Sequence, residues 1–136
     1  MNTIKYLLLF FYFILISCNE KSNPIASNVD FSYLYVNWVH AYEEENINDS
    51  IKIFRPNDYK TFPPSRYREM LSFKQDSSCV YLVLAPNDAH YFQNGRWSLI
   101  NKEKNIIKIL DSSNTVYKKF QIIELKQNIL KIILVD

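Results

Sequence analysis

The residue types best suited to chemistry in this chain are a histidine followed by three glutamates, and a second histidine much further along. His40 precedes the run Glu43 to Glu45, and His90 follows Asp88. A metal site needs nitrogen and oxygen ligands that converge on one point. The chain has neither a Cys-x-x-Cys nor a His-Glu-x-x-His spacing, so solvated or singly hydrogen-bonded histidines are the favoured interpretation. We therefore expect no metal and no other cofactor.

Catalytic sets can be assembled from the same residues, but no motif supports them. Paired carboxylates for acid–base catalysis would come from Glu43 to Glu45 or from Glu69, and a charged strand end that stays in solvent is the simpler interpretation. A nucleophilic set would need Ser65, His40 and Asp88, yet the Gly-x-Ser-x-Gly turn of hydrolases is absent. The single glycine excludes a phosphate-cradling loop. The sequence predicts no catalytic residue and no enzyme.

Arginines around a proline-rich link are the more definite candidates for binding. In a strand, the period of two would place Arg66 and Arg68 on one face, and His40 and Glu44 on one face of another strand. We predict that these side chains gather near one opening of the fold. Cross-strand ion pairs of Arg55, Arg66 and Arg68 with Glu43 to Glu45 are the favoured interpretation. A rim that grips the anionic head of a ligand is the functional alternative. The candidate ligand-binding residues are Trp38, His40, Glu44, Arg66 and Arg68.

The elements that must position these residues are predicted to be consecutive β-strands. Asn94-Gly95 stands between two strand-like runs, and this dipeptide is the strongest short hairpin signal. A short helical turn is expected near Val29 to Leu34, and no stretch has sustained helical periodicity. The expected strands are 35–43, 51–55, 66–74, 79–84, 91–92, 96–100, 106–110, 118–125 and 129–135.

Short strands joined by tight turns predict an all-β domain, either an up-and-down antiparallel barrel of about eight strands or a sandwich. We favour the barrel because closure removes exposed strand edges, and a barrel of this size can hold one small ligand. Trp38 and Trp97 lie in alternating runs, so both are expected to be largely buried in the core.

The start of the chain has the parts of a secretory signal. A single Lys5 precedes an apolar run from Tyr6 to Ile16, which is too short for a bilayer-spanning helix of about 20 residues. With Leu15-Ile16-Ser17-Cys18 after it, this segment resembles the signal peptide and lipobox of bacterial lipoproteins. The resemblance implies cleavage before Cys18 and acylation of its thiol with palmitate or a related chain. An uncleaved anchor helix is the alternative.

The same resemblance sets the expected organisation of the chain. Residues 1–17 would be the signal peptide, residues 18–30 the lipidated cysteine with a polar tether, and residues 31–136 the barrel domain. The protein would be a lipid-anchored monomer of the bacterial cell envelope, with the lipid on Cys18 as its membrane partner. Asn19 stands where enterobacterial lipoproteins retained at the inner membrane have Asp, which favours the outer membrane.

Charge and cysteine content limit the other partners. Residues 1–17 contain one lysine and no acid, so their removal lowers the formal net charge from +2 to +1. A nearly neutral domain gives no argument for nucleic acid. Once Cys18 carries lipid, Cys79 has no partner for an intramolecular disulfide, and its apolar surroundings in sequence predict a buried, unreactive thiol.

A second resemblance covers about Tyr35 to Val135. The pieces Trp38 to Glu45, Ile53 to Pro56, Phe62 to Arg68 and Gly95 to Trp97 together resemble a family of small bacterial lipocalin-like proteins. The resemblance implies a small antiparallel barrel and no established chemistry. Lipocalins have Gly-x-Trp on the first strand, whereas this chain has Asn37-Trp38, so the details of lipocalin ligand binding do not transfer.

Two functions follow from these observations. The first is a non-catalytic binding module whose barrel holds a small apolar or amphipathic ligand. The second is a protein-interaction module with a filled core, such as an inhibitor or an envelope accessory protein. The occupancy of the barrel distinguishes them.

Overall fold

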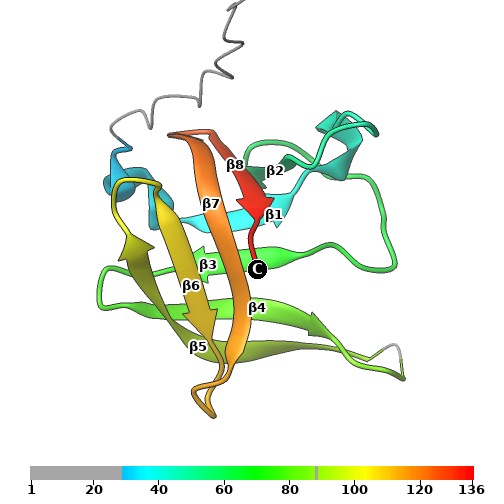
Figure 1. The fold of residues 1–136 in the computed structure, drawn as a ribbon. Coiled ribbons are helices and arrows are strands. Elements are labelled where there is room, and N and C mark those ends of the chain that lie inside the picture. The colour runs from blue at the N-terminus through cyan, green and yellow to red at the C-terminus, as the bar shows by residue number, and fades with distance from the viewer. Residues whose placement is uncertain (1–28, 88) are drawn as a thin grey trace, which may run out of the picture.

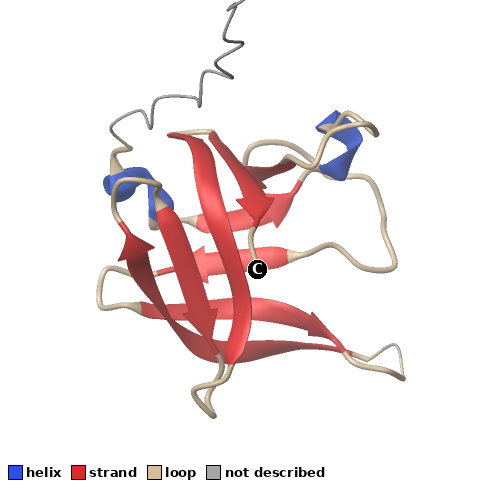
Figure 2. Cartoon of the chain, in the orientation of Figure 1, coloured by secondary structure: helices blue, strands red, loops and turns tan. Residues whose placement is uncertain are grey.

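The computed structural model describes residues 29–87 and 89–136, so the predictions for Cys18, for the signal peptide and tether, and for Asp88 lie outside the described residues. The described chain is almost entirely β-structure (Figures 1 and 2). Its elements, in chain order, are η2 (Phe31–Leu34), β1 (Asn37–His40), η3 (Tyr42–Glu44), β2 (Lys52–Pro56), β3 (Met70–Phe73), β4 (Ser78–Leu84), β5 (His90–Asn101), β6 (Ile106–Leu110), β7 (Val116–Lys126) and β8 (Ile129–Leu134).

The eight strands form one closed barrel in which every neighbouring pair is antiparallel. The strand order around the barrel is β1-β2-β8-β7-β6-β5-β4-β3. The predicted all-β, up-and-down antiparallel barrel of about eight strands is therefore confirmed. Closure leaves no strand with a free edge among them, which removes the usual template for aggregation.

The first hairpin enters this barrel in an order that the sequence does not reveal. Strand β1 pairs with both β2 and β3, while β2 pairs with β8. Because β2 and β3 are both antiparallel to β1, they run in the same direction. The connection of residues 57–69 must therefore return past β1 to the other end of the barrel, and it forms the long loop at the right of Figure 1.

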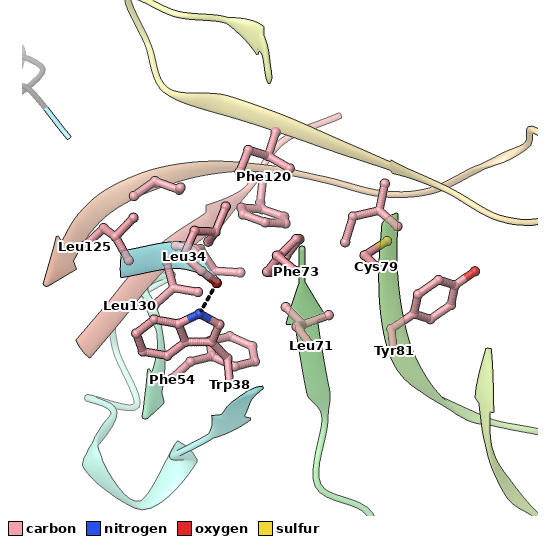
Figure 3. Packing of buried hydrophobic residues seen from close by; sticks show 14 residues of the cluster. Leu34, Trp38, Phe54, Leu71, Phe73, Cys79, Tyr81, Phe120, Leu125 and Leu130 are labelled. Atoms are coloured by element: carbon pink, nitrogen blue, oxygen red, sulfur yellow. Dashed lines mark hydrogen bonds between the residues drawn. The ribbon is translucent and has the colours of Figure 1, made fainter. Parts of the chain in front are cut away.

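The interior is filled by large apolar side chains that alternate along the strands (Figure 3). Trp38 and Phe54 are fully buried, and Phe73 and Phe120 meet at 6.3 Å between ring centroids. Trp97 packs against this core but is only partly buried. The expected burial is thus confirmed for Trp38 and is weaker for Trp97.

The turn η2 closes one end of the barrel. Its Leu34 is fully buried, and the indole N–H of Trp38 donates to the Leu34 carbonyl at 2.9 Å. The Asp30 carboxylate accepts from the backbone N–H of Ser32 at 2.9 Å and caps the turn. The expected helical turn near Val29 to Leu34 is therefore present, and the polar atom of the Trp38 ring is satisfied inside the core.

The predicted hairpin at Asn94-Gly95 is wrong, because both residues lie in the middle of the continuous strand β5. Gly95 pairs with Cys79, and the Tyr81 ring lies next to the place that a Cβ would take. A Cβ at this position would meet the backbone oxygen of Leu110 and would come within 2.9 Å of the Tyr81 ring. The glycine is needed for close packing and not for a turn.

Gly95→Ala therefore provides a direct test of this packing. We expect the substitution to lower the free energy of unfolding by about 1–3 kcal/mol, as overpacking does. A glycine in an unobstructed strand would give the opposite result, because alanine loses less backbone entropy on folding. Urea midpoints of the two proteins decide between these outcomes. Ile47→Ala is the control, since Ile47 is 97% exposed and its truncation should change stability by less than about 0.5 kcal/mol.

Candidate functional site

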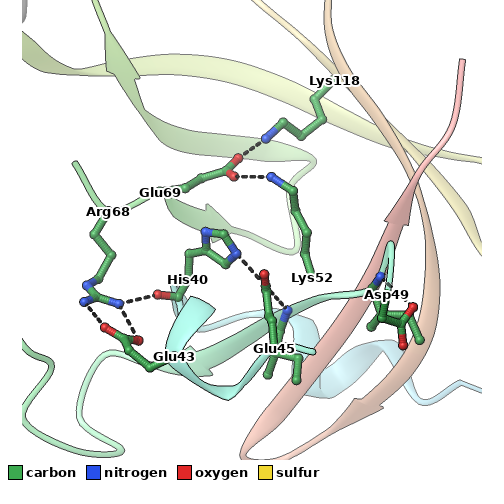
Figure 4. A network of polar contacts seen from close by, with 10 residues as sticks. His40, Glu43, Glu45, Asp49, Lys52, Arg68, Glu69 and Lys118 are labelled. Atoms are coloured by element: carbon green, nitrogen blue, oxygen red, sulfur yellow. Dashed lines mark hydrogen bonds and ion pairs between the residues drawn. The ribbon is translucent and has the colours of Figure 1, made fainter. Parts of the chain in front are cut away.

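Three consecutive glutamates, in η3 and at its end, each bind a different part of the fold; Figure 4 shows the contacts of Glu43 and Glu45. Glu43 pairs with Arg68, Glu44 pairs with Arg55 and Lys60, and Glu45 contacts the His40 ring. The first strand ends at His40 and the chain turns at η3, so the predicted strand 35–43 is too long. His40 and Glu44 consequently do not share a strand face, and the carboxylate beside His40 belongs to Glu45.

The Arg68 guanidinium is held by hydrogen bonds to several groups and by contact with an aromatic ring. It donates to both oxygens of Glu43, at 3.0 and 2.5 Å, and to the carbonyls of His40 and Pro63. The same group lies 4.4 Å from the ring centroid of Tyr42. Arg68 lowers the pKa of Glu43 to about 2. This residue fastens the connection of residues 57–69 to β1, which is the structural interpretation of the arginines.

Arg55 is the second fixed cation. Its Nε donates to Glu44 at 2.9 Å and its Nη1 donates to the Asn128 carbonyl at 2.8 Å. The guanidinium also lies 4.5 Å from the ring centroid of Tyr59. Arg55 thereby connects η3, the segment after β2 and the turn between β7 and β8.

Inside the barrel, at the end opposite η2, a carboxylate is enclosed by two lysines. Glu69 is 5% exposed, and its two oxygens pair with Lys118 and, at 3.7 Å, with Lys52. Directly paired residues share a face; Lys52 pairs with Ile132 and Lys118 with Ile109, and both isoleucines are fully buried. The three charges therefore point into the barrel.

The electrostatics of this interior cluster follow from its burial. Desolvation, together with the nearby Lys52 ammonium, lowers the pKa of Lys118 to about 8. Burial also lowers the pKa of His40, although the Glu45 carboxylate, 2.6 Å from Nε2, opposes that shift. Glu45 in turn accepts the backbone N–H of Ile53 at 2.8 Å. Each of these groups thus has a partner within the fold.

A pair of stacked tyrosines lies beside the cluster. The Tyr81 and Tyr117 rings are 3.9 Å apart between centroids and nearly parallel, and the Lys118 ammonium lies 5.5 Å from the Tyr117 centroid. Burial raises the pKa of Tyr117 to about 12. The Tyr81 hydroxyl is buried without a hydrogen-bond partner among the described residues. Such an unsatisfied group lowers the free energy of unfolding.

The largest hollow described is outside the barrel, at the end that η2 closes. It has a volume of about 920 Å³ and is lined by aromatic, apolar and polar side chains. We call it the outer groove. One wall comes from Tyr33, Val36 and Asn37, and the rest comes from Pro56 to Tyr59 and from Lys126 to Asn128.

The predicted binding residues are only partly brought together. His40, Glu44 and Arg68 do meet around η3, but each is occupied by a partner within the fold. Arg66 is exposed, outside the short strand β3, and Trp38 is fully buried. The interior lysines were missed, although the alternation of Lys118 with Phe120 would have placed that lysine on the buried face.

The remaining features to consider are metal ligands, the cysteine thiol and apolar helices. In residues 29–87 and 89–136 no three metal-ligating side chains come together. Cys79 is 2% exposed, so its expected burial is confirmed, and this burial raises the pKa of its thiol to about 11. No helix in the described part of the chain is long and apolar enough to cross a membrane. Comparisons with protein-family models, curated proteins and solved structures find no match.

Removal of the interior carboxylate tests whether the lysines depend on it. Glu69→Gln leaves the largely buried Lys118 ammonium beside a neutral group, and breaking a buried pair costs about 3–5 kcal/mol of unfolding free energy. Lys52 is partly exposed and can turn to solvent. The double variant Glu69→Leu with Lys118→Met removes both charges and should recover most of that loss. Guanidinium unfolding at about pH 7 measures all three proteins.

The pH dependence provides a second readout of the same variant. Lys118 in the folded protein binds fewer protons than in the unfolded chain between its pKa of about 8 and the ordinary value of 10.5. Stability from this group therefore rises as the pH increases through that range. The penalty of Glu69→Gln should shrink there, because neutral Lys118 needs no partner. An unchanged penalty would show that Lys118 is not responsible for it.

Proposed function

We propose that this protein is a non-catalytic binding module, held at the bacterial cell envelope by lipid on Cys18, and that it binds its ligand or partner through the outer groove. The interior of the barrel then serves as a scaffold. The observation that carries the proposal is the position of the largest described hollow, outside a barrel whose core is closely filled.

The packing of the interior favours the filled-core alternative over a ligand inside the barrel. Phe54, Phe120 and Trp38 are fully buried by one another and by the strands. None of the three lines a hollow among those described. An apolar ligand of ordinary size needs about 300 Å³ or more, and would have to displace these side chains. The sequence-based expectation of an internal apolar ligand is therefore the weaker proposal.

The outer groove has the features of a binding surface. Tyr33 is 41% exposed and Tyr59 is 44% exposed, so both rings are accessible to a partner. The hollow of about 920 Å³ is open to solvent over much of its boundary, which leaves room for an extended ligand on the surface. Arg55 holds Tyr59 and Asn128 in fixed positions, and a preorganised site loses less entropy on binding.

The lipid anchor is tested by metabolic labelling of the full chain in a bacterial host. With labelled palmitate, the wild-type protein should carry the label and enter the membrane fraction, because acyl chains supply the anchoring energy. Cys18→Ser should lose the label and stay unprocessed or leave the membrane. Cys79→Ser is the matched control and should be labelled normally, since its thiol is buried. Labelling of the Cys18→Ser protein would refute the anchor.

Barrel occupancy is tested by native mass spectrometry of the full chain released gently from detergent. We expect the mass of the polypeptide with its covalent lipid and no further bound molecule. An environment-sensitive fatty-acid probe should give no saturable signal. Saturable binding of the probe that Phe54→Ala strengthens would place the ligand inside the barrel and overturn the proposal of a filled scaffold.

A further inference from the structure

We propose that the outer groove binds a neutral oligosaccharide. This inference rests on the proposed function and specifies the class of ligand. It comes from three properties of the lining, namely exposed tyrosine rings, an unusual number of carboxamides and the near absence of net charge.

The two tyrosines can act as stacking platforms. A sugar ring has faces of C–H groups that pack on an aromatic ring, and a tyrosine offers a large, rigid contact area with a polar hydroxyl at its end. Tyr33 and Tyr59 stand on separate walls of the groove, one in η2 and the other after β2. A ligand that contacts both rings would therefore touch two segments of the chain at once.

The carboxamides match the hydroxyl groups of a sugar. Each carboxamide both donates and accepts hydrogen bonds, as each hydroxyl does. The known hydrogen bonds of these residues use backbone atoms. The Asn57 N–H donates to the Asn37 carbonyl at 2.9 Å, and the Asn128 carbonyl accepts from Arg55. Their side chains remain available to a ligand. The four carboxamide residues of the lining are Asn37, Asn57, Gln127 and Asn128.

The charges of the groove argue against a strongly charged ligand. Lys126 and Asp58 are of opposite sign, and the Lys126 ammonium already lies 2.5 Å from the Glu124 carboxylate. A polyanion such as a nucleic acid needs a concentration of positive charge. An apolar helix or lipid would need a lining with fewer polar groups. A neutral polyol fits the mixture that is present.

Arg55 acts as the positioning residue of this site. Its guanidinium carbon lies 4.5 Å from the centroid of the Tyr59 ring, and its Nη1 donates to the Asn128 carbonyl at 2.8 Å. The Glu44 carboxylate accepts from the Arg55 Nε and keeps the guanidinium in place. Two walls of the groove are thereby kept at a fixed distance. Arg55 thus supports the lining of the groove, while its own charge is engaged by Glu44.

The inference is tested by NMR titration of the isotope-labelled full chain with purified cello-, chito- and malto-oligosaccharides, in a detergent without a sugar headgroup. At least one sugar should cause saturable shifts in the groove residues, and Tyr59→Ala should weaken its binding about tenfold. Tyr59→Phe should retain most of the affinity, because stacking needs the ring. Tyr91→Ala is the control, since that tyrosine is 49% exposed at the opposite end of the barrel.

Three outcomes overturn the inference. One is the absence of groove shifts with all three sugars, another is saturation that Tyr59→Ala leaves unchanged, and the third is shifts confined to other surfaces. An extended tyrosine- or proline-containing peptide titrated in parallel separates the two levels of the argument. Groove shifts with the peptide and none with the sugars would refute the sugar ligand while leaving the groove as the binding surface. An internal ligand in the mass spectrum would refute the proposed function itself.

Discussion

The barrel depends on three neighbouring carboxylates, two of which fasten a connection that has no strand neighbours of its own, while the third joins β1 to β2. Because β2 and β3 run in the same direction on either side of β1, residues 57–69 must cross from one end of the barrel to the other. Glu43 holds the end of that crossing through Arg68, and Glu44 holds Lys60 within it. Glu45 joins β1 and β2 by contacting His40 and the Ile53 N–H.

The two ends of the barrel are closed by different chemistry. At the end covered by η2, Leu34 and Trp38 form an apolar plug. At the other end, Glu69 lies between two lysines inside the wall of strands. Desolvation makes such buried charges a poor source of net stability. We interpret this cluster as a device that permits one arrangement of the surrounding strands, since any other register would leave a charge unpaired.

Some of this structure can be predicted from sequence and some cannot, for identifiable reasons. The period of two is local, so the strands and the buried Trp38 follow from it. The position of Gly95 depends on the Tyr81 ring and on Leu110 across two strand pairings, and no local pattern reports those. His40 and Glu44 were paired by assuming that a strand continues, whereas the chain turns at η3. The outer groove joins residues from three distant parts of the chain.

The placement of β2 between β1 and β8 also affects how the chain folds during synthesis. Strand β2 pairs on its other side with β8, the last of the described strands. A ribosome therefore delivers seven strands before the ring can close, and during that time β2 and β7 both present unpaired edges. Contacts between strands as far apart in the sequence as β2 and β8 also form slowly. A chain that lacked β8 would thus keep β2 and β7 as open edges, and such edges favour aggregation over a closed ring.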